Sequence, residues 1–113
     1  MIDSWDGDPV SGFDEDFAEG FVGRTLLVGV THVGADGAVV RQEQVHGVIV
    51  GASAYGIDVE LRGTHEGVVW RMPPFLDELA VAAPGTYRLR ASGESVVDPD
   101  FLFSLTIHGA DRH

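Results

Sequence analysis

Histidine side chains are the first candidates for chemistry, because imidazole binds metals and exchanges protons near neutral pH. The five histidines fall in four different predicted elements and at the last position: His32, His46, His65, His108 and His113. None of their spacings forms a His-x-His or His-Glu-x-x-His motif. A hairpin turning through residues 34–37 would place His32 opposite Val39. In that register His46 lies opposite Thr25, too far from His32 to share a metal, so we expect no metal site and no cofactor.

Two carboxylate pairs, each spaced two residues apart, could act as acid and base or bind a hard cation. Asp58 and Glu60 alternate with apolar residues on a predicted strand, which indicates a solvent face. Asp98 and Asp100 lie in a predicted loop, where acids commonly accept backbone N–H bonds; a hydrolase using them is the weakest hypothesis. The chain has no cysteine, no Gly-x-Ser-x-Gly motif and no phosphate-binding glycine loop. We therefore assign no catalytic residue and expect a protein that is not an enzyme.

Negative charge is concentrated near the N-terminus. The 18 acids and 7 bases give a net charge of −11, and residues 1–22 carry −7 of it without any Lys or Arg. This balance argues against nucleic acid as a partner. We interpret residues 1–22 as an acidic, mobile arm with a helical turn over residues 14–19. It could keep the protein soluble, dock on a basic partner or fold back onto its own domain.

The arm also contains aromatic side chains, which are typical anchors of protein interfaces. Its candidate interaction residues are Trp5, Phe13, Asp14, Glu15, Asp16 and Phe17. They point to a protein partner, expected to be basic.

The rest of the chain reads as short strands separated by turn residues, as in a single β domain over residues 23–109, followed by a tail at 110–113. Expected strands lie near residues 25–31, 38–50, 57–61, 68–72, 87–89 and 101–107, with a short helix over 73–79 and a loop over 93–100. The pattern predicts a mainly β fold: a small antiparallel β-barrel or sandwich, SH3-like or related, of about six strands. An unpaired edge at residues 101–107 would permit a strand-paired dimer.

Membrane association is not expected. The longest apolar stretch, residues 26–30, is too short to span a bilayer. The first residues are acidic and lack the basic region of a signal peptide. The default prediction is a cytoplasmic protein with no membrane partner.

The most distinctive sequence lies between residues 73 and 101. It comprises Pro73-Pro74-Phe75-Leu76-Asp77, Pro84-Gly85-Thr86-Tyr87-Arg88-Leu89-Arg90, Ser92-Gly93-Glu94 and Val97-Asp98-Pro99-Asp100. These motifs resemble a widespread set of small acidic, uncharacterised bacterial proteins, over roughly residues 22–108. That resemblance brings no activity or site residues with it. In size and charge the chain is also similar to bacterial immunity proteins, which neutralise a partner toxin.

Two functional hypotheses follow. The leading one is a non-enzymatic, acidic protein-interaction module, with an immunity-type inhibitor of a basic toxin or nuclease as its specific form. The alternative is a small-ligand or cation-binding β-barrel whose pocket is lined by His46, Trp70 and Tyr87.

Overall fold

The computed structural model describes residues 4–90 and 92–108, so the predicted tail at 110–113 and His113 lie outside the described residues. One α-helix and eight strands form in the described part. They are α1 (Glu15–Glu19), β1 (Thr25–Val33), β2 (Val39–Ser53), β3 (Gly56–Leu61), β4 (Val69–Met72), β5 (Ala80–Val81), β6 (Thr86–Arg88), β7 (Ser95–Val97) and β8 (Phe101–His108). The prediction of a mainly β fold is confirmed.

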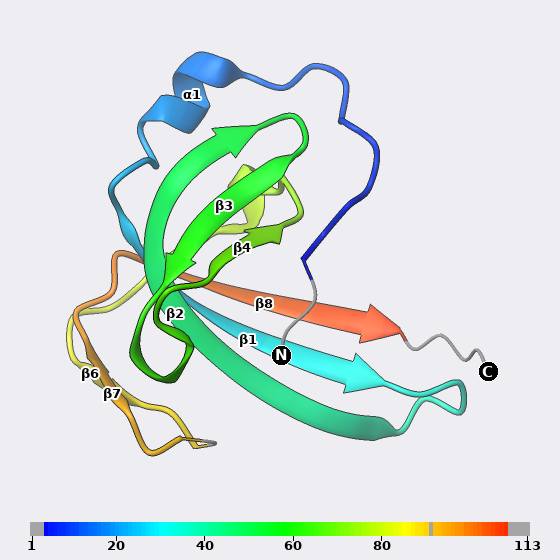
Figure 1. Cartoon of the computed structure of the whole chain (residues 1–113), viewed down its shortest axis with the longest axis vertical. Coiled ribbons are helices and arrows are strands. Elements are labelled where there is room, and N and C mark those ends of the chain that lie inside the picture. The colour runs from blue at the N-terminus through cyan, green and yellow to red at the C-terminus, as the bar shows by residue number, and fades with distance from the viewer. Residues whose placement is uncertain (1–3, 91, 109–113) are drawn as a thin grey trace.

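Six strands form one bent sheet in the order β4-β3-β2-β1-β8-β5, and β6 and β7 form a separate two-stranded sheet (Figure 1). The first four strands make the predicted antiparallel meander. Strand β8 instead pairs parallel to β1. Among the described residues the sheet does not close into a barrel, because β4 and β5 remain its two edge strands.

The long strand β2 belongs to both halves of the sheet and curves between them (Figure 1). Its first part pairs with β1 and its last part with β3, with an irregularity between Ile49 and Gly51. A glycine is required at position 47, because a Cβ there would collide with the backbone carbonyl of Glu60. The tight approach of β3 to β2 therefore depends on Gly47.

Strand alternation places apolar side chains on both faces of β1. The inner face carries the main core, in which Val28, Ile49 and Trp70 are fully buried together with side chains from β3, β4 and β8. On the outer face, Leu27 packs with Leu89 and Val96 of the β6–β7 hairpin in a second, smaller cluster. Because one strand serves two cores, its apolar residues do not alternate cleanly with polar ones.

Three local predictions need correction. The expected loop over residues 93–100 contains strand β7, and the expected helix over 73–79 is reduced to a 3-10 turn at Leu76–Glu78. In the first hairpin, His32 lies opposite Arg41, and Thr25 lies opposite Val48, because the turn is one residue longer than predicted and a bulge follows His32. The register is therefore shifted by two residues, which leaves each side chain on its predicted face.

The β8 edge is covered only in part. Strand β5 pairs with Phe101 and Leu102, so in the described part residues 103–108 have a strand partner on the β1 side alone. No helix among the described residues has the length and apolar character needed to cross a membrane.

Candidate functional site

The acidic arm lies against the domain over its described residues. The Trp5 amide donates to the Arg71 carbonyl at 2.7 Å, and the Arg71 amide donates to Ser4 Oγ at 3.1 Å. Farther along, the Val10 amide donates to the Ala54 carbonyl at 3.0 Å. The arm thus runs along the β4 edge and past the β2–β3 turn to α1 (Figure 1). The described part of the arm therefore folds back onto its own domain, which is one of the three alternatives that the sequence left open.

Helix α1 fixes the second half of the arm, and the predicted helical turn there is confirmed. Asp14 caps the helix, since its Oδ1 accepts the Phe17 amide at 3.0 Å. Ala18 is buried in the main core, and Phe21 packs beside Phe101 with ring centroids 5.1 Å apart. Ala18 on α1 and Phe21 just after it therefore dock the helix on the sheet.

A groove, which we call the arm groove, separates the arm from the segment that follows β4. Its volume is about 320 Å³. It is lined by Val10, Ser11, Gly12, Phe13, Asp14, Phe17, Pro74, Phe75, Leu76, Asp77 and Glu78. Phe17 and Phe75 remain 47% and 40% exposed, although rings of this size normally bury most of their surface. The predicted interaction residues Phe13, Asp14 and Phe17 meet here.

Carboxylates surround the arm groove without any compensating base. Asp14, Asp77 and Glu78 line it, and no Lys, Arg or His does. Glu15 and Asp16 follow Asp14 on the exposed first turn of α1. Within the described part of the chain none of these five acids forms an ion pair. The groove therefore combines an exposed apolar floor with uncompensated negative charge.

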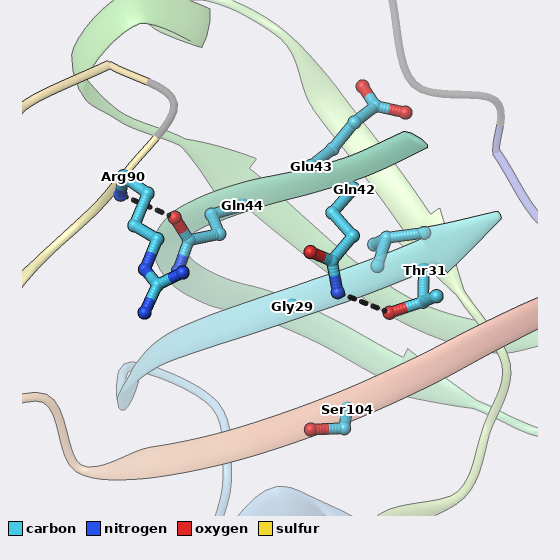
Figure 2. Close-up of a pocket in the computed structure, with 8 residues that line it drawn as sticks. Gly29, Thr31, Gln42, Glu43, Gln44, Arg90 and Ser104 are labelled. Carbon is cyan, nitrogen blue, oxygen red and sulfur yellow. Dashed lines mark hydrogen bonds between the residues drawn. The ribbon is translucent and has the colours of Figure 1, made fainter. Parts of the chain in front are cut away.

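A larger, polar groove of about 520 Å³ crosses the outer face of β1, β2 and β8. Figure 2 shows Gly29 at its base, with hydroxyl and amide side chains around it: Thr31, Gln42, Gln44 and Ser104. Gln42 Nε2 donates to Thr31 Oγ1 at 3.3 Å, and Gln44 Oε1 accepts the Arg90 amide at 2.8 Å. This groove offers hydrogen bonds but contains no aromatic side chain and one cation, Arg90.

The predicted pocket of His46, Trp70 and Tyr87 does not form, because these side chains lie on opposite faces of the sheet. Trp70 is part of the main core, whereas Tyr87 packs on the outer cluster and donates its hydroxyl to the Ala83 carbonyl at 2.7 Å. His46 lies beside Leu27, also on the outer face. The alternation of apolar and polar residues along the strands did not reveal on which face of the sheet each aromatic side chain would lie.

His46 instead faces Glu94, with Nε2 at 3.8 Å from Glu94 Oε2. Glu94 also accepts the Thr64 amide at 3.0 Å and the Ser92 hydroxyl at 2.9 Å. Burial raises the pKa of Glu94, but these hydrogen bonds and His46 outweigh that effect and lower the pKa below its ordinary value. These contacts join the turn at residues 63–65 to the β6–β7 hairpin. We therefore assign His46 and Glu94 a structural role.

Both carboxylate pairs are engaged within the fold. Asp98 Oδ1 accepts the Gly85 amide at 2.7 Å, and Asp100 Oδ2 accepts the Thr25 amide at 2.9 Å. Asp58 forms a two-point ion pair with Arg71, with distances of 2.7 and 3.1 Å. Glu60 contacts Arg62. These contacts give each pair a structural role.

Metal-binding groups do not converge in the part of the chain that the structure describes: no three His, Asp or Glu side chains lie close enough to hold an ion. Comparison with known proteins gives no match to a family model, to a curated protein or to a solved structure.

Proposed function

We propose that this protein is a non-enzymatic binding module that recognises a basic protein segment through the arm groove. The observation that carries the proposal is the exposure of Phe17 and Phe75 in a groove lined by Asp14, Asp77 and Glu78. Exposed aromatics within a concave surface are the usual anchors of protein interfaces.

The two components of the groove would act differently in binding. Covering the exposed parts of Phe17 and Phe75 would supply affinity, roughly 1–2 kcal/mol for each ring. The carboxylates would attract a positively charged partner and accelerate its association. A Lys- or Arg-containing segment with one or two apolar side chains complements both components.

A basic partner also fits the likeness to immunity proteins in size and charge. Such proteins neutralise toxins, and a basic toxin or nuclease would present the required cationic surface. A nucleic acid fits poorly, since its phosphates would meet the acids of the groove.

The proposal is tested by capturing partners from the source cells, then measuring the affinity of each purified partner for matched variants. Phe17→Ala removes a groove ring, whereas Tyr55→Ala removes another exposed ring, outside the groove. We expect Phe17→Ala to weaken binding at least tenfold and Tyr55→Ala to leave it unchanged. Equal affinities of both variants and the wild type would refute the proposal.

The electrostatic component has its own control. The double variant Asp77→Asn/Glu78→Gln should slow association and reduce its dependence on salt. Glu66→Gln removes a charge from the turn after β3, outside the groove, and should change the association rate much less. A partner that lacks net positive charge would contradict the proposed chemistry.

A further inference from the structure

A second hollow lies on the inner side of the bent sheet. This apolar cavity, with a volume of about 470 Å³, opens between β4, the inner face of β8 and the start of the arm. Its apolar lining consists of Trp5, Trp70, Pro73, Phe75, Leu105 and Ile107. A volume of this size with largely apolar walls is typical of small-molecule sites.

Both tryptophans of the chain lie in this cavity. Trp70 is 1% exposed and forms part of the main core, whereas Trp5 is 37% exposed and comes from the arm. The cavity is therefore closed on one side by the domain and on another by a segment held through the Trp5–Arg71 hydrogen bond. The Trp5 indole would offer flat apolar surface to a ligand, whereas almost none of the Trp70 surface is accessible.

Polar groups occur at one part of the lining, where Glu43 organises two neighbours. Glu43 Oε2 lies 2.7 Å from His32 Nε2 and accepts Arg41 Nε at 3.2 Å. Burial raises the pKa of Glu43, but the hydrogen bonds from His32 and Arg41 outweigh it and lower the pKa. Glu43 thus holds Arg41 beside the cavity through Nε.

The rest of the polar lining is mixed: Asp6 and Thr106 can accept hydrogen bonds, Arg71 is paired with Asp58, and Arg41 and Ser4 carry free donors. In the described part of the chain, the terminal guanidinium nitrogens of Arg41 donate to no protein acceptor. Ser4 Oγ already accepts the Arg71 amide, so its hydroxyl hydrogen is available. Guanidinium nitrogens can only donate. A ligand group placed at Arg41 must therefore be an acceptor.

From this geometry we infer that the cavity binds a small molecule with an apolar body and a carbonyl or carboxylate oxygen at one end. The body lies against Trp5 and Leu105, and the oxygen accepts from Arg41. This site uses the inner face of the sheet and shares Phe75 with the arm groove, but its ligand is distinct from the protein partner proposed above.

Tryptophan emission provides a direct test, because both fluorophores line the cavity. The probes are octanoate, which ends in a carboxylate, and octanamide, which ends in a neutral carbonyl. We expect a saturable change in emission with at least one of them, together with a rise in the melting temperature. A preference for octanoate would identify the acceptor as a carboxylate, and a preference for octanamide would identify a carbonyl.

Three variants locate the site. Leu105→Phe fills the cavity and should weaken binding about tenfold or more, whereas Ser104→Ala, on the opposite face of the same strand, should not change it. Arg41→Met keeps the apolar stem at an exposed position and should weaken the preferred probe about tenfold, as expected for a lost hydrogen bond to a charged group.

The inference is overturned if neither probe gives a saturable change at millimolar concentration. It is also overturned if Leu105→Phe, shown to be folded by its circular dichroism, binds as tightly as the wild type. If Arg41→Met binds both probes with unchanged affinity, the assignment of Arg41 as the donor to the ligand oxygen is overturned.

Discussion

The arm (described residues 4–22) and the hairpin segment (residues 84–90 and 92–100) both lie on the bent sheet, but they use their carboxylates in opposite ways. In the hairpin segment each of three acids accepts a backbone amide, in two cases from outside the segment. These acids are Glu94, Asp98 and Asp100, and their donors are Thr64, Gly85 and Thr25. Among the acids of the described arm, only Asp14 accepts a hydrogen bond, and that bond is local to α1.

The difference separates structural acids from acids available for binding. A carboxylate that satisfies buried or ordered amides contributes to folding and has little capacity left for a partner. The arm acids have no such internal role, and the arm is held mainly by Ala18, Phe21 and backbone hydrogen bonds. Residue type alone does not distinguish the two groups, because both consist of Asp and Glu near Gly and Pro.

The largest expected effect is the loss of the outer cluster. Leu89 is almost fully buried between the hairpin and Leu27, so Leu89→Ala should lower the free energy of unfolding by about 2–4 kcal/mol. Urea denaturation measures this change. Val81→Ala, at a highly exposed apolar position, is the control and should cost less than about 0.5 kcal/mol. A small cost for Leu89→Ala would mean that the hairpin is not an integral part of the fold.

A smaller effect is expected at Asp100, which joins the starts of β1 and β8. The Thr25 amide holds the pKa of Asp100 below its ordinary value; burial opposes this, and the Thr25 hydroxyl and Arg24 add to the lowering. Because the folded pKa is lowered, the stabilisation is present above the pKa of the unfolded chain and disappears as pH falls through the folded value. Asp100→Asn should therefore cost about 1–2 kcal/mol at pH 7 and progressively less as the solution is acidified.

Urea denaturation of Asp100→Asn and wild type at several pH values tests whether the cost of the substitution decreases as the pH falls. Asp8→Asn, in the arm, is the control, since Asp8 has no hydrogen bond or ion pair within the described chain. The role assigned to Asp100 fails if its substitution costs the same at all pH values.

The smallest expected effect is a difference in stability between variants of two nearby acids in the arm. Asp14→Ala and Asp16→Ala remove the same charge, but only Asp14 caps α1. Loss of a cap costs about 0.5–1 kcal/mol, whereas Asp16→Ala should change the free energy of unfolding by less than that. Thermal denaturation of both variants measures the difference. Identical stabilities would show that α1 docks through its apolar side alone.

Much of the fold was predictable because strand periodicity and turn residues are local signals. Residues 57–61 alternate cleanly, and strand β3 occupies that range. The parallel pairing of β8 with β1 was not predictable, because it depends on contacts between residues far apart in the chain. Strand β7 was missed because its three residues carry almost no periodic signal.

The candidate site was predictable only in part. Composition identified Phe13, Asp14 and Phe17, which do meet in one groove. It could not identify Phe75, Asp77 and Glu78 as their neighbours, because this contact joins segments about sixty residues apart. That Trp5 and Trp70 line the same cavity was missed for the same reason, and the one usable signal was that the arm contained an unexplained tryptophan.

The parallel pair of β1 and β8 has a consequence for the kinetics of folding. It brings Thr25 and Asp100, 75 positions apart, into hydrogen-bond contact. Closing so long a loop costs entropy before the pair gains its contacts, which slows folding. During synthesis the β1–β4 meander can form early. Strand β8, the second pairing partner of β1, becomes complete only after residue 108 has been synthesised. Until then one edge of β1 is open to pairing with other chains.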